Sequence, residues 1–269
     1  MTGDFPLKWV RELMLAMTEK KLIPISEIFG PVIQGEGSLA GTPTVFVRVG
    51  GCDYRCSWCD TMYAVDKKEY GHTWTKMSCD EIFHEVQNLS KNVPLLVTLS
   101  GGNPALFALG PLIDAGHRLG YTFACETQGS VSQPWFCNLS HLILSPKPPS
   151  SGESTNWDKL LECIAASQIL NPPTKVSLKI VVSNYADYEY AKKVKEIIDQ
   201  RLLSETNRWW PIPFYILVCS EIVGTTPYLR AKIAEKYDEI LSWIKKDQWY
   251  DCHLGFQQHT MIYGNKRGV

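Results

Sequence analysis

Short apolar segments alternate with longer amphipathic segments along most of the chain. The short segments are rich in β-branched and aromatic residues, which is typical of buried strands, and the longer ones have helical spacing of apolar positions. The pattern predicts strands at 44–49, 94–99, 121–125, 141–144, 175–182, 214–218 and 253–257. It predicts helices at about 78–89, 104–119, 134–137, 156–169, 186–203 and 227–246. We therefore expect six strand–helix units followed by one more strand.

This alternation predicts an α/β protein with a parallel sheet and helical crossovers. Six units are too few for a closed eight-fold barrel, and both an open doubly wound sheet and a partial barrel fit the periodicity. The chain has no evident linker and no internal repeat of roughly 20–50 residues, so we expect one core domain at 22–269. Residues 1–21 are expected to form an N-terminal extension with a short amphipathic helix.

The composition limits the class of protein. Hydrophobic residues make up 45% and charged residues 20% of the 269 positions, which allows a sizeable core and excludes a disordered chain. The net charge is −1 and Lys and Arg form no stripe, so we expect no nucleic-acid partner. No apolar run approaches the roughly 18–20 residues of a membrane span, and the charged N-terminus is unlike a signal peptide. We therefore expect a cytoplasmic protein without a membrane partner.

Polar and glycine-rich segments follow four of the expected strands, at 50–52, 100–103, 126–129 and 145–147. In both candidate architectures the carboxyl ends of parallel strands gather at one edge, where ligands bind. We therefore expect these segments to form one site.

Three of the nine cysteines are clustered: Cys52, Cys56 and Cys59 have C-x3-C-x2-C spacing directly after the first expected strand. Thiolates are soft ligands that suit zinc or an iron–sulfur cluster. A structural zinc site needs a fourth ligand, for which Cys79 and His72 are candidates. A [4Fe–4S] cluster held by three cysteines leaves one iron open to a substrate or cofactor. The lack of a second cysteine pair favours the cluster, and zinc remains the alternative.

The cysteine loop resembles the signature of the radical S-adenosylmethionine (SAM) superfamily. Trp58 stands where the superfamily usually has an aromatic residue beside the adenine of SAM. The segment 100–104, Ser-Gly-Gly-Asn-Pro, is similar to the superfamily's glycine-glycine-glutamate motif, with Asn103 in place of the glutamate. The resemblance implies a partial (βα)6 barrel of the radical SAM type. It also implies that an electron from the cluster cleaves SAM to methionine and a 5′-deoxyadenosyl radical, which removes a hydrogen atom from the substrate.

Further segments resemble the 7-carboxy-7-deazaguanine synthase family, from about residue 24 to the chain end. They are 34–37, 46–52, 59–61, 126–129, 145–149 and 264–269. The resemblance implies a lyase that converts 6-carboxy-5,6,7,8-tetrahydropterin to 7-carboxy-7-deazaguanine with loss of ammonia, in the route to queuosine and other 7-deazapurines. It implies a [4Fe–4S] cluster, SAM and Mg²⁺ as cofactors, a homodimer, and an electron donor such as flavodoxin or ferredoxin.

The resemblance also implies roles for individual residues, with no catalytic side chain beyond the cluster and SAM. The clustered cysteines would hold the cluster, and Thr61 would supply the hard oxygen that Mg²⁺ prefers. The implied SAM contacts are Trp58, Cys59, Asp60, Gly102, Ser145, Pro146 and Lys147. The implied substrate contacts are Ile33, Gln34, Gly35, Glu36, Arg48, Ser100, His259 and Val269.

The side-chain chemistry of these residues allows simpler interpretations as well. Arg48 offers a planar fork for a carboxylate, and Gln34 and Glu36 can pair with a pterin edge. On local sequence alone, Arg48 could equally form an ion pair on a surface strand, and Thr61 could cap a helix.

Two other functions stay open. One is another radical SAM enzyme, such as a glycyl-radical activating enzyme, and the other is a non-catalytic metal-binding module. The 34–37 loop and the C-terminal motif argue against the first, because a protein substrate needs an open groove.

Overall fold

Nine strands form one mixed sheet in the order β3-β1-β2-β4-β5-β6-β7-β8-β9. The computed structural model describes residues 21–206, 211–220, 226–264 and 266–268, so the helix expected in the N-terminal extension lies outside the described residues. The seven strands from β2 to β9 pair in parallel, as the alternation predicted. They are β2 (Pro43–Val49), β4 (Leu96–Gly101), β5 (Thr122–Thr127), β6 (His141–Leu144), β7 (Lys175–Val182), β8 (Phe214–Val218) and β9 (His253–Gly255).

Two antiparallel strands that the sequence pattern did not predict extend the sheet at one edge. β1 (Ile23–Ile33) pairs with β2 on one side and with β3 (Thr75–Met77) on the other. β1 contains two prolines and a glycine, which are depleted in strands, and its pairing with β2 shifts register between Phe29 and Val32. The regular alternation that reveals a strand is therefore broken in β1.

Most of the helices lie between successive strands along the chain. The α-helices in the described ranges are α2 (Met62–Val65), α3 (Lys67–Tyr70), α4 (Cys79–Ser90), α5 (Gly110–His117), α6 (Trp157–Ser167), α7 (Tyr185–Thr206), α8 (Thr226–Asp247) and α9 (Gln258–Tyr263). A capping box begins α4: the Glu81 N–H donates to Ser78 Oγ at 3.3 Å, and the Ser78 N–H donates to Glu81 Oε2 at 2.7 Å. The local signal therefore predicted this helix start correctly.

One predicted helix is interrupted, and a second is present as a 3₁₀ helix. The predicted helix at 104–119 is a 3₁₀ turn at Pro104–Leu106 followed by α5, because the extended backbone of Phe107 ends the turn. The short helix predicted at 134–137 is present as a 3₁₀ helix, Pro134–Asn138. In both places proline starts a helical turn that does not propagate as an α-helix.

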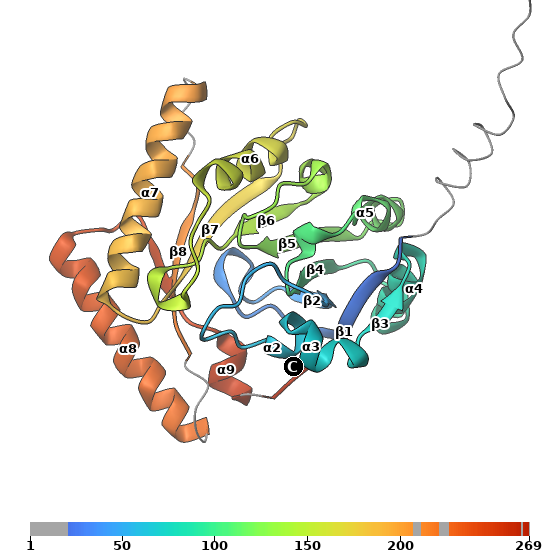
Figure 1. Cartoon of the computed structure of the whole chain (residues 1–269), viewed down its shortest axis with the longest axis horizontal. Coiled ribbons are helices and arrows are strands. Elements are labelled where there is room, and N and C mark those ends of the chain that lie inside the picture. The colour runs from blue at the N-terminus through green and yellow to red at the C-terminus, as the bar shows by residue number, and fades with distance from the viewer. Residues whose placement is uncertain (1–20, 207–210, 221–225, 265, 269) are drawn as a thin grey trace, which may run out of the picture.

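The strands curve into a partial barrel whose edge strands, β3 and β9, do not pair with each other. The longer helices α4 to α8 form an arc outside the strands, with the short α9 packed against α8 and the short α2 and α3 next to each other (Figure 1). Six parallel strands, β2 and β4 to β8, each lead through a crossover to the next, and β9 follows. The expected partial (βα)6 barrel is confirmed.

Alternation within the strands divides side chains between the core and an inner cavity. In β2, Val45, Val47 and Val49 are fully buried in the hydrophobic core. Phe46 and Arg48, on the opposite face, line the cavity. Because successive side chains of a strand point to opposite faces, the strand register determines which residues reach the site.

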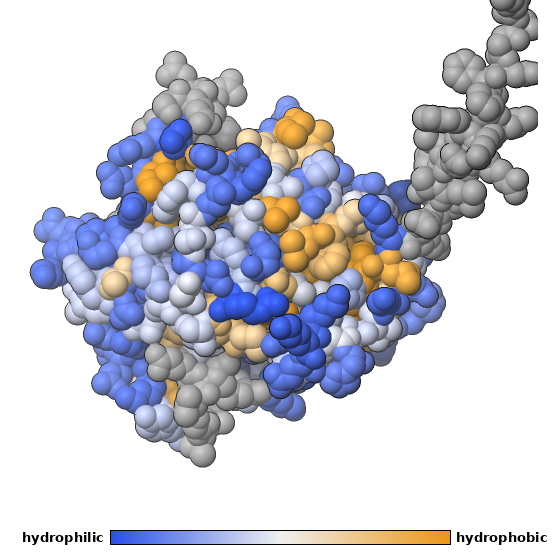
Figure 2. Space-filling view, viewed as in Figure 1, coloured by the Kyte–Doolittle hydropathy of each residue, from blue (hydrophilic) through white to orange (hydrophobic). Residues whose placement is uncertain are grey.

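The face of the molecule drawn in Figure 2 is mostly polar. Figure 2 shows a mainly hydrophilic face, with apolar side chains gathered over the region of β4 and β5. Leu106 and Leu119, on either side of α5, are among the exposed apolar residues. No helix within the described ranges is both long enough and apolar enough to cross a membrane.

Candidate active site

A cavity of about 410 Å³ lies at the carboxyl ends of the parallel strands, within the usual range of small-molecule sites. It brings together most of the residues that the sequence analysis singled out. They are Ile33, Gln34, Glu36, Arg48, Cys52, Cys56, Trp58, Cys59, Asp60, Thr61, Ser100, Gly102, Ser145, Lys147 and His259. Gly35 and Pro146 do not line the cavity, and Val269 lies outside the described residues. The four polar segments therefore meet at one site, as their positions predicted.

The cysteine loop begins at the end of β2, and there the backbone lies very close to the end of the neighbouring strand β4. Gly51 has a φ of +109°, which favours glycine, and a Cβ on Gly102 would lie 1.9 Å from the Gly51 carbonyl oxygen. The Asn103 N–H donates to the same oxygen at 2.8 Å. The two glycine motifs thus pack backbone to backbone, and the segment after β4 supports the start of the cysteine loop.

The three clustered thiols are free and line the same cavity. Burial raises the pKa of Cys52, and it raises the pKa of Cys56 to about 11. In the described part of the chain, no three His, Cys, Asp or Glu side chains converge as a single zinc ion requires, and neither Cys79 nor His72 lines the cavity. A cluster binds each thiolate at a different iron, so this donor set fits a [4Fe–4S] cluster better than one ion.

The cysteine loop is fastened to the segment that follows β6. The Ser57 N–H donates to the Ser151 carbonyl at 2.9 Å, and Ser57 Oγ donates to the Ser150 carbonyl at 2.7 Å. The indole N–H of Trp58 donates to Ser150 Oγ at 2.9 Å. Lys147, from the same segment, lies 6.0 Å from the centre of the Trp58 ring. An aromatic face and a cation are therefore held together beside the cysteines.

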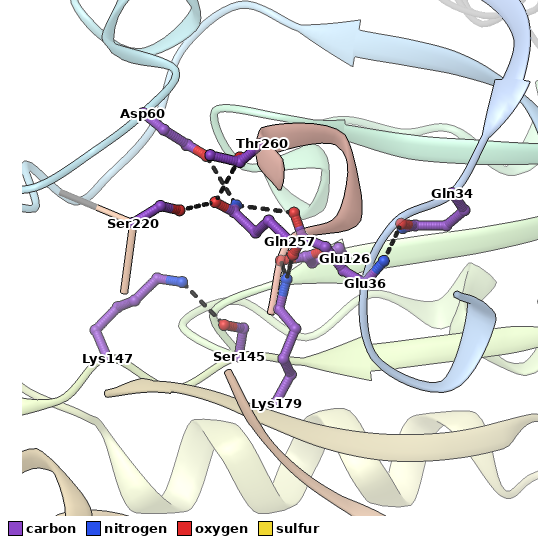
Figure 3. Close-up of polar contacts among 10 residues, drawn as sticks. All are labelled: Gln34, Glu36, Asp60, Glu126, Ser145, Lys147, Lys179, Ser220, Gln257 and Thr260. Atoms are coloured by element: carbon purple, nitrogen blue, oxygen red, sulfur yellow. Dashed lines mark hydrogen bonds and ion pairs between the residues drawn. The ribbon is translucent and has the colours of Figure 1, made fainter. Parts of the chain in front are cut away.

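Lys179, on β7, is a buried cation with 4% of its side chain exposed. Its Nζ pairs with Glu36 Oε2 at 2.5 Å and with Glu126 Oε1 (Figure 3). Burial alone would lower the pKa of Lys179, but the carboxylates of Glu126 and Glu36 outweigh burial and raise it. Burial alone would raise the pKa of Glu36, but Lys179 and then His259 hold it well below its usual range. Lys179 and Glu36 are therefore charged at neutral pH.

Gln257, the residue that precedes α9, joins this network to the cysteine loop. Its Nε2 donates to Glu36 Oε1 at 2.9 Å and to Asp60 Oδ2 at 3.1 Å. Its Oε1 accepts hydrogen bonds from Ser220 Oγ and, at 3.3 Å, from Thr260 Oγ1. Figure 3 shows these side chains converging from separate segments of the chain. The amide thus orients Glu36 and Asp60 relative to each other.

Arg48 lies in an aromatic environment with one acidic partner. Its Nε pairs with Glu27 Oε1 at 2.8 Å, and 14% of its side chain is exposed. The rings of Phe29, Tyr63 and Phe46 have their centres within 5.6–6.0 Å of the guanidinium carbon. The ion pair allowed by local sequence is therefore present, but it lies in the cavity wall and not on an outer surface.

Several cavity residues were missed by the sequence analysis. Lys179 is flanked by apolar residues in the mostly buried middle of β7, and a charged residue at such a position was the signal that could have revealed it. Tyr63 offered no comparable signal, and neither did Glu27, which does not itself line the cavity, because their roles depend on contacts with Arg48 and with each other. Glu126 fell within a segment that was singled out, but no role was predicted for it.

Solved structures of low sequence identity share the fold. The crystal structure of QueE from Escherichia coli has a TM-score of 0.59 at 19% identity, covering 88% of this chain and 94% of that chain. Streptococcus suis SuiB bound to the precursor peptide SuiA has a TM-score of 0.52 at 14% identity, covering 79% of this chain and 48% of that one. At these identities the likeness concerns the fold alone.

Sequence comparisons identify the family. Residues 33–117 match the model of the 4Fe-4S single cluster domain. The 7-carboxy-7-deazaguanine synthase of Bacillus subtilis (strain 168) is 40% identical over 256 residues, covering 93% of this chain and 99% of the relative. The protein of the same name from Bacillus cereus is 35% identical over 258 residues, covering 92% and 99%. The chain therefore belongs to the 7-carboxy-7-deazaguanine synthase family.

Proposed function

We propose that the protein converts 6-carboxy-5,6,7,8-tetrahydropterin to 7-carboxy-7-deazaguanine with release of ammonia, as a radical SAM enzyme of queuosine and other 7-deazapurine biosynthesis. The observation that carries this proposal is a single cavity in which three cysteine thiols lie beside charged and aromatic side chains. A carboxylated heterocycle with many ring donors needs a cationic fork, carboxylate acceptors and aromatic faces, and all three are present there.

The proposed cluster ligands are Cys52, Cys56 and Cys59. When bound, the cluster supplies the electron that cleaves SAM and so provides the radical that starts the reaction. The chain's own contribution is to hold three thiols at the cavity wall and to shield one of them, since Cys56 is buried and Cys52 and Cys59 are partly buried.

We propose SAM contacts for Trp58, Cys59, Asp60, Gly102, Ser145, Pro146 and Lys147. The aromatic face of Trp58 suits an adenine, and the cation of Lys147 suits a carboxylate. Lys147 is held in place because its Nζ donates to Ser145 Oγ at 3.0 Å. The position of Lys147 in the cavity lining supports its proposed contact with SAM.

The substrate is proposed to lie between Arg48 and the pair of carboxylates. The ion pair with Glu27 engages Nε of Arg48, and the planar guanidinium has further donors for a substrate carboxylate. Glu36 is kept charged by Lys179, so it can accept hydrogen bonds from ring N–H groups. The other proposed contacts are Ile33, Gln34, Gly35, Ser100, His259 and Val269.

Thr61 is proposed as the protein ligand of Mg²⁺. It precedes α2, yet its side chain makes no capping hydrogen bond, and its Oγ1 lies 3.6 Å from Cys59 Sγ. A hard oxygen that is not used as a cap and lines the cavity fits an ion that takes one or two protein ligands and several waters.

We expect Thr61→Ala to raise the Mg²⁺ concentration that gives half-maximal activity by about tenfold, because one ligand oxygen is lost. SAM binding, measured separately by equilibrium dialysis, should change little. The Thr61→Ser variant keeps the hydroxyl and is expected to behave like the unmodified protein. An unaltered metal dependence in Thr61→Ala would count against the assignment.

The same proposal includes a homodimer, a cytoplasmic location and an external one-electron donor such as flavodoxin or ferredoxin. Each can be tested separately from the reaction, by sedimentation, by fractionation and by replacing a chemical reductant with the protein donor. None of the three is needed for the assay below.

The experiment that tests the function is a turnover assay under anaerobic conditions. Reconstituted, dithionite-reduced protein is incubated with SAM, Mg²⁺ and 6-carboxy-5,6,7,8-tetrahydropterin, and the products are identified by mass. We expect the deazapurine and ammonia in equal amounts and about four irons per chain. SAM cleavage without deazapurine would favour another radical SAM enzyme. One zinc per chain and no colour would favour a non-catalytic module.

A further inference from the structure

Asn103 stands where the radical SAM superfamily usually has glutamate, and its side chain is fully engaged inside the protein. It is 0% exposed and does not line the cavity. Its Nδ2 donates to Asp53 Oδ1 at 2.8 Å and to Ser130 Oγ at 3.1 Å. Its Oδ1 accepts from the Ala105 N–H at 3.1 Å and from Thr127 Oγ1 at 2.8 Å. All the usual hydrogen-bonding capacity of the amide is therefore used within the protein.

These contacts fix the orientation of a second amide, that of Gln128. The backbone N–H of Ala105 can only donate, so it fixes Oδ1 of Asn103 on its own side and turns Nδ2 toward Asp53. Asp53 Oδ1 also accepts from Gln128 Nε2 at 2.6 Å. Because a carboxylate accepts and does not donate, the nitrogen of Gln128 must face Asp53. The same nitrogen lies 3.7 Å from Cys52 Sγ, within hydrogen-bonding range of a sulfur acceptor.

We propose that Gln128 donates an N–H···S hydrogen bond to Cys52 and thereby raises the reduction potential of the cluster bound there. The inference rests on the proposed function, because it assumes that Cys52 is a cluster ligand. Reduction adds negative charge to the cluster, and a donor aimed at a ligand sulfur stabilises the reduced form more than the oxidised form. Gln128 is 6% exposed, so solvent weakens this interaction little.

The neutral amide at position 103 is explained by the same geometry. A glutamate there would place a second carboxylate against Asp53 and would offer it no donor. Asp53 would then turn away, and the nitrogen of Gln128 would lose the acceptor that aims it at Cys52. Asn103 and Asp53 are therefore positioning residues for Gln128.

The test is the midpoint potential of the reconstituted cluster in Gln128→Met, measured by redox titration with EPR detection. Methionine keeps the length of glutamine and removes the donor. We expect the reduction equilibrium to become about tenfold less favourable, which corresponds to a fall of about 59 mV for one electron. Gln133→Met is the matched control, because Gln133 Nε2 donates to the Ala105 carbonyl at 2.6 Å and to no sulfur. Its potential should equal that of the unmodified protein.

A full cluster with an unshifted potential in Gln128→Met would overturn this inference and leave the proposed function standing. Failure of the unmodified protein to bind a cluster would overturn both. A second measurement does not depend on the variant folding: pulsed EPR on reduced protein labelled with ¹⁵N in its glutamine side chains. Coupling of an amide nitrogen to the cluster is expected, and its loss is expected in Gln128→Met. The absence of coupling in the unmodified protein would refute the hydrogen bond.

Discussion

The Cys56→Ala variant is expected to fold, to lack a complete cluster and to have no turnover. Three cysteines are the fewest that hold a cluster with one open iron, so the loss of one leaves two ligands. Cys56 lies in a loop whose backbone is fastened by its neighbours, with Ser57 bonded to Ser151 at 2.9 Å. Removing one small buried side chain should therefore cost only about 1 kcal/mol of unfolding free energy. Iron content, the EPR signal of the reduced protein and the turnover assay measure the three effects.

The matched control for this variant is Cys79→Ala. Cys79 was a candidate for a fourth zinc ligand, but it begins α4, donates weakly to the Ala108 carbonyl at 3.9 Å and does not line the cavity. We expect this variant to retain about four irons and full turnover. Normal turnover by Cys56→Ala would refute its role as a ligand, and loss of the metal in Cys79→Ala would revive the zinc alternative.

The parallel part of the fold was predictable because its signals are local. Each strand of the series is a short apolar run flanked by turn residues, and the alternation with helices limits the possible topologies. β1 and β3 were not predicted, because the alternation in β1 is interrupted at residues 30–31 and β3 has only three residues. Both strands depend on long-range pairing, since β1 joins β2 and β3 joins β1.

The candidate site was predictable where each of its motifs is a short continuous segment that directly follows a strand. The cysteine loop and the segment at 100–102 lie at neighbouring strand ends, so the order of strands was enough to unite them. The contacts of Lys179 could not be predicted in this way. They join residues 143 and 53 positions apart, and only the curvature of the sheet brings these residues together. The roles of the individual site residues remain predictions for the experiments above.

After Cys56→Ala, the Lys179→Met variant is expected to have the largest effect. It should lower both the stability and the turnover of the protein. Removing the cation leaves two carboxylates facing each other beside a cavity, with 15% of Glu36 and 23% of Glu126 exposed. Breaking a buried ion pair in this way costs about 3 kcal/mol. One carboxyl group then holds a proton at neutral pH, and as a neutral group it accepts from a ring N–H group more weakly than a carboxylate does. We therefore expect kcat/KM for the pterin to fall by about 10²-fold, as for a lost charged hydrogen bond.

The stability loss in Lys179→Met should depend on pH in a direction that identifies its cause. In the unmodified protein the pKa of Glu36 is lowered from 4.5 to about 2, so its stabilising contribution is present at neutral pH and is lost as the pH falls through this range. In the variant, burial and the facing carboxylate raise the pKa of one carboxyl group above its unfolded value. Stability is then lost as the pH rises, and the difference from the unmodified protein should widen between about pH 5 and pH 8 in urea unfolding.

Two control variants separate charge from packing at this position. Lys179→Arg keeps the cation and should recover most of the stability, and Lys175→Met changes an exposed lysine on the same strand and should have no effect. If Lys179→Met were as stable as Lys175→Met at pH 8, Lys179 would not be holding two charged carboxylates. The substrate site would then need another explanation for the charge of Glu36.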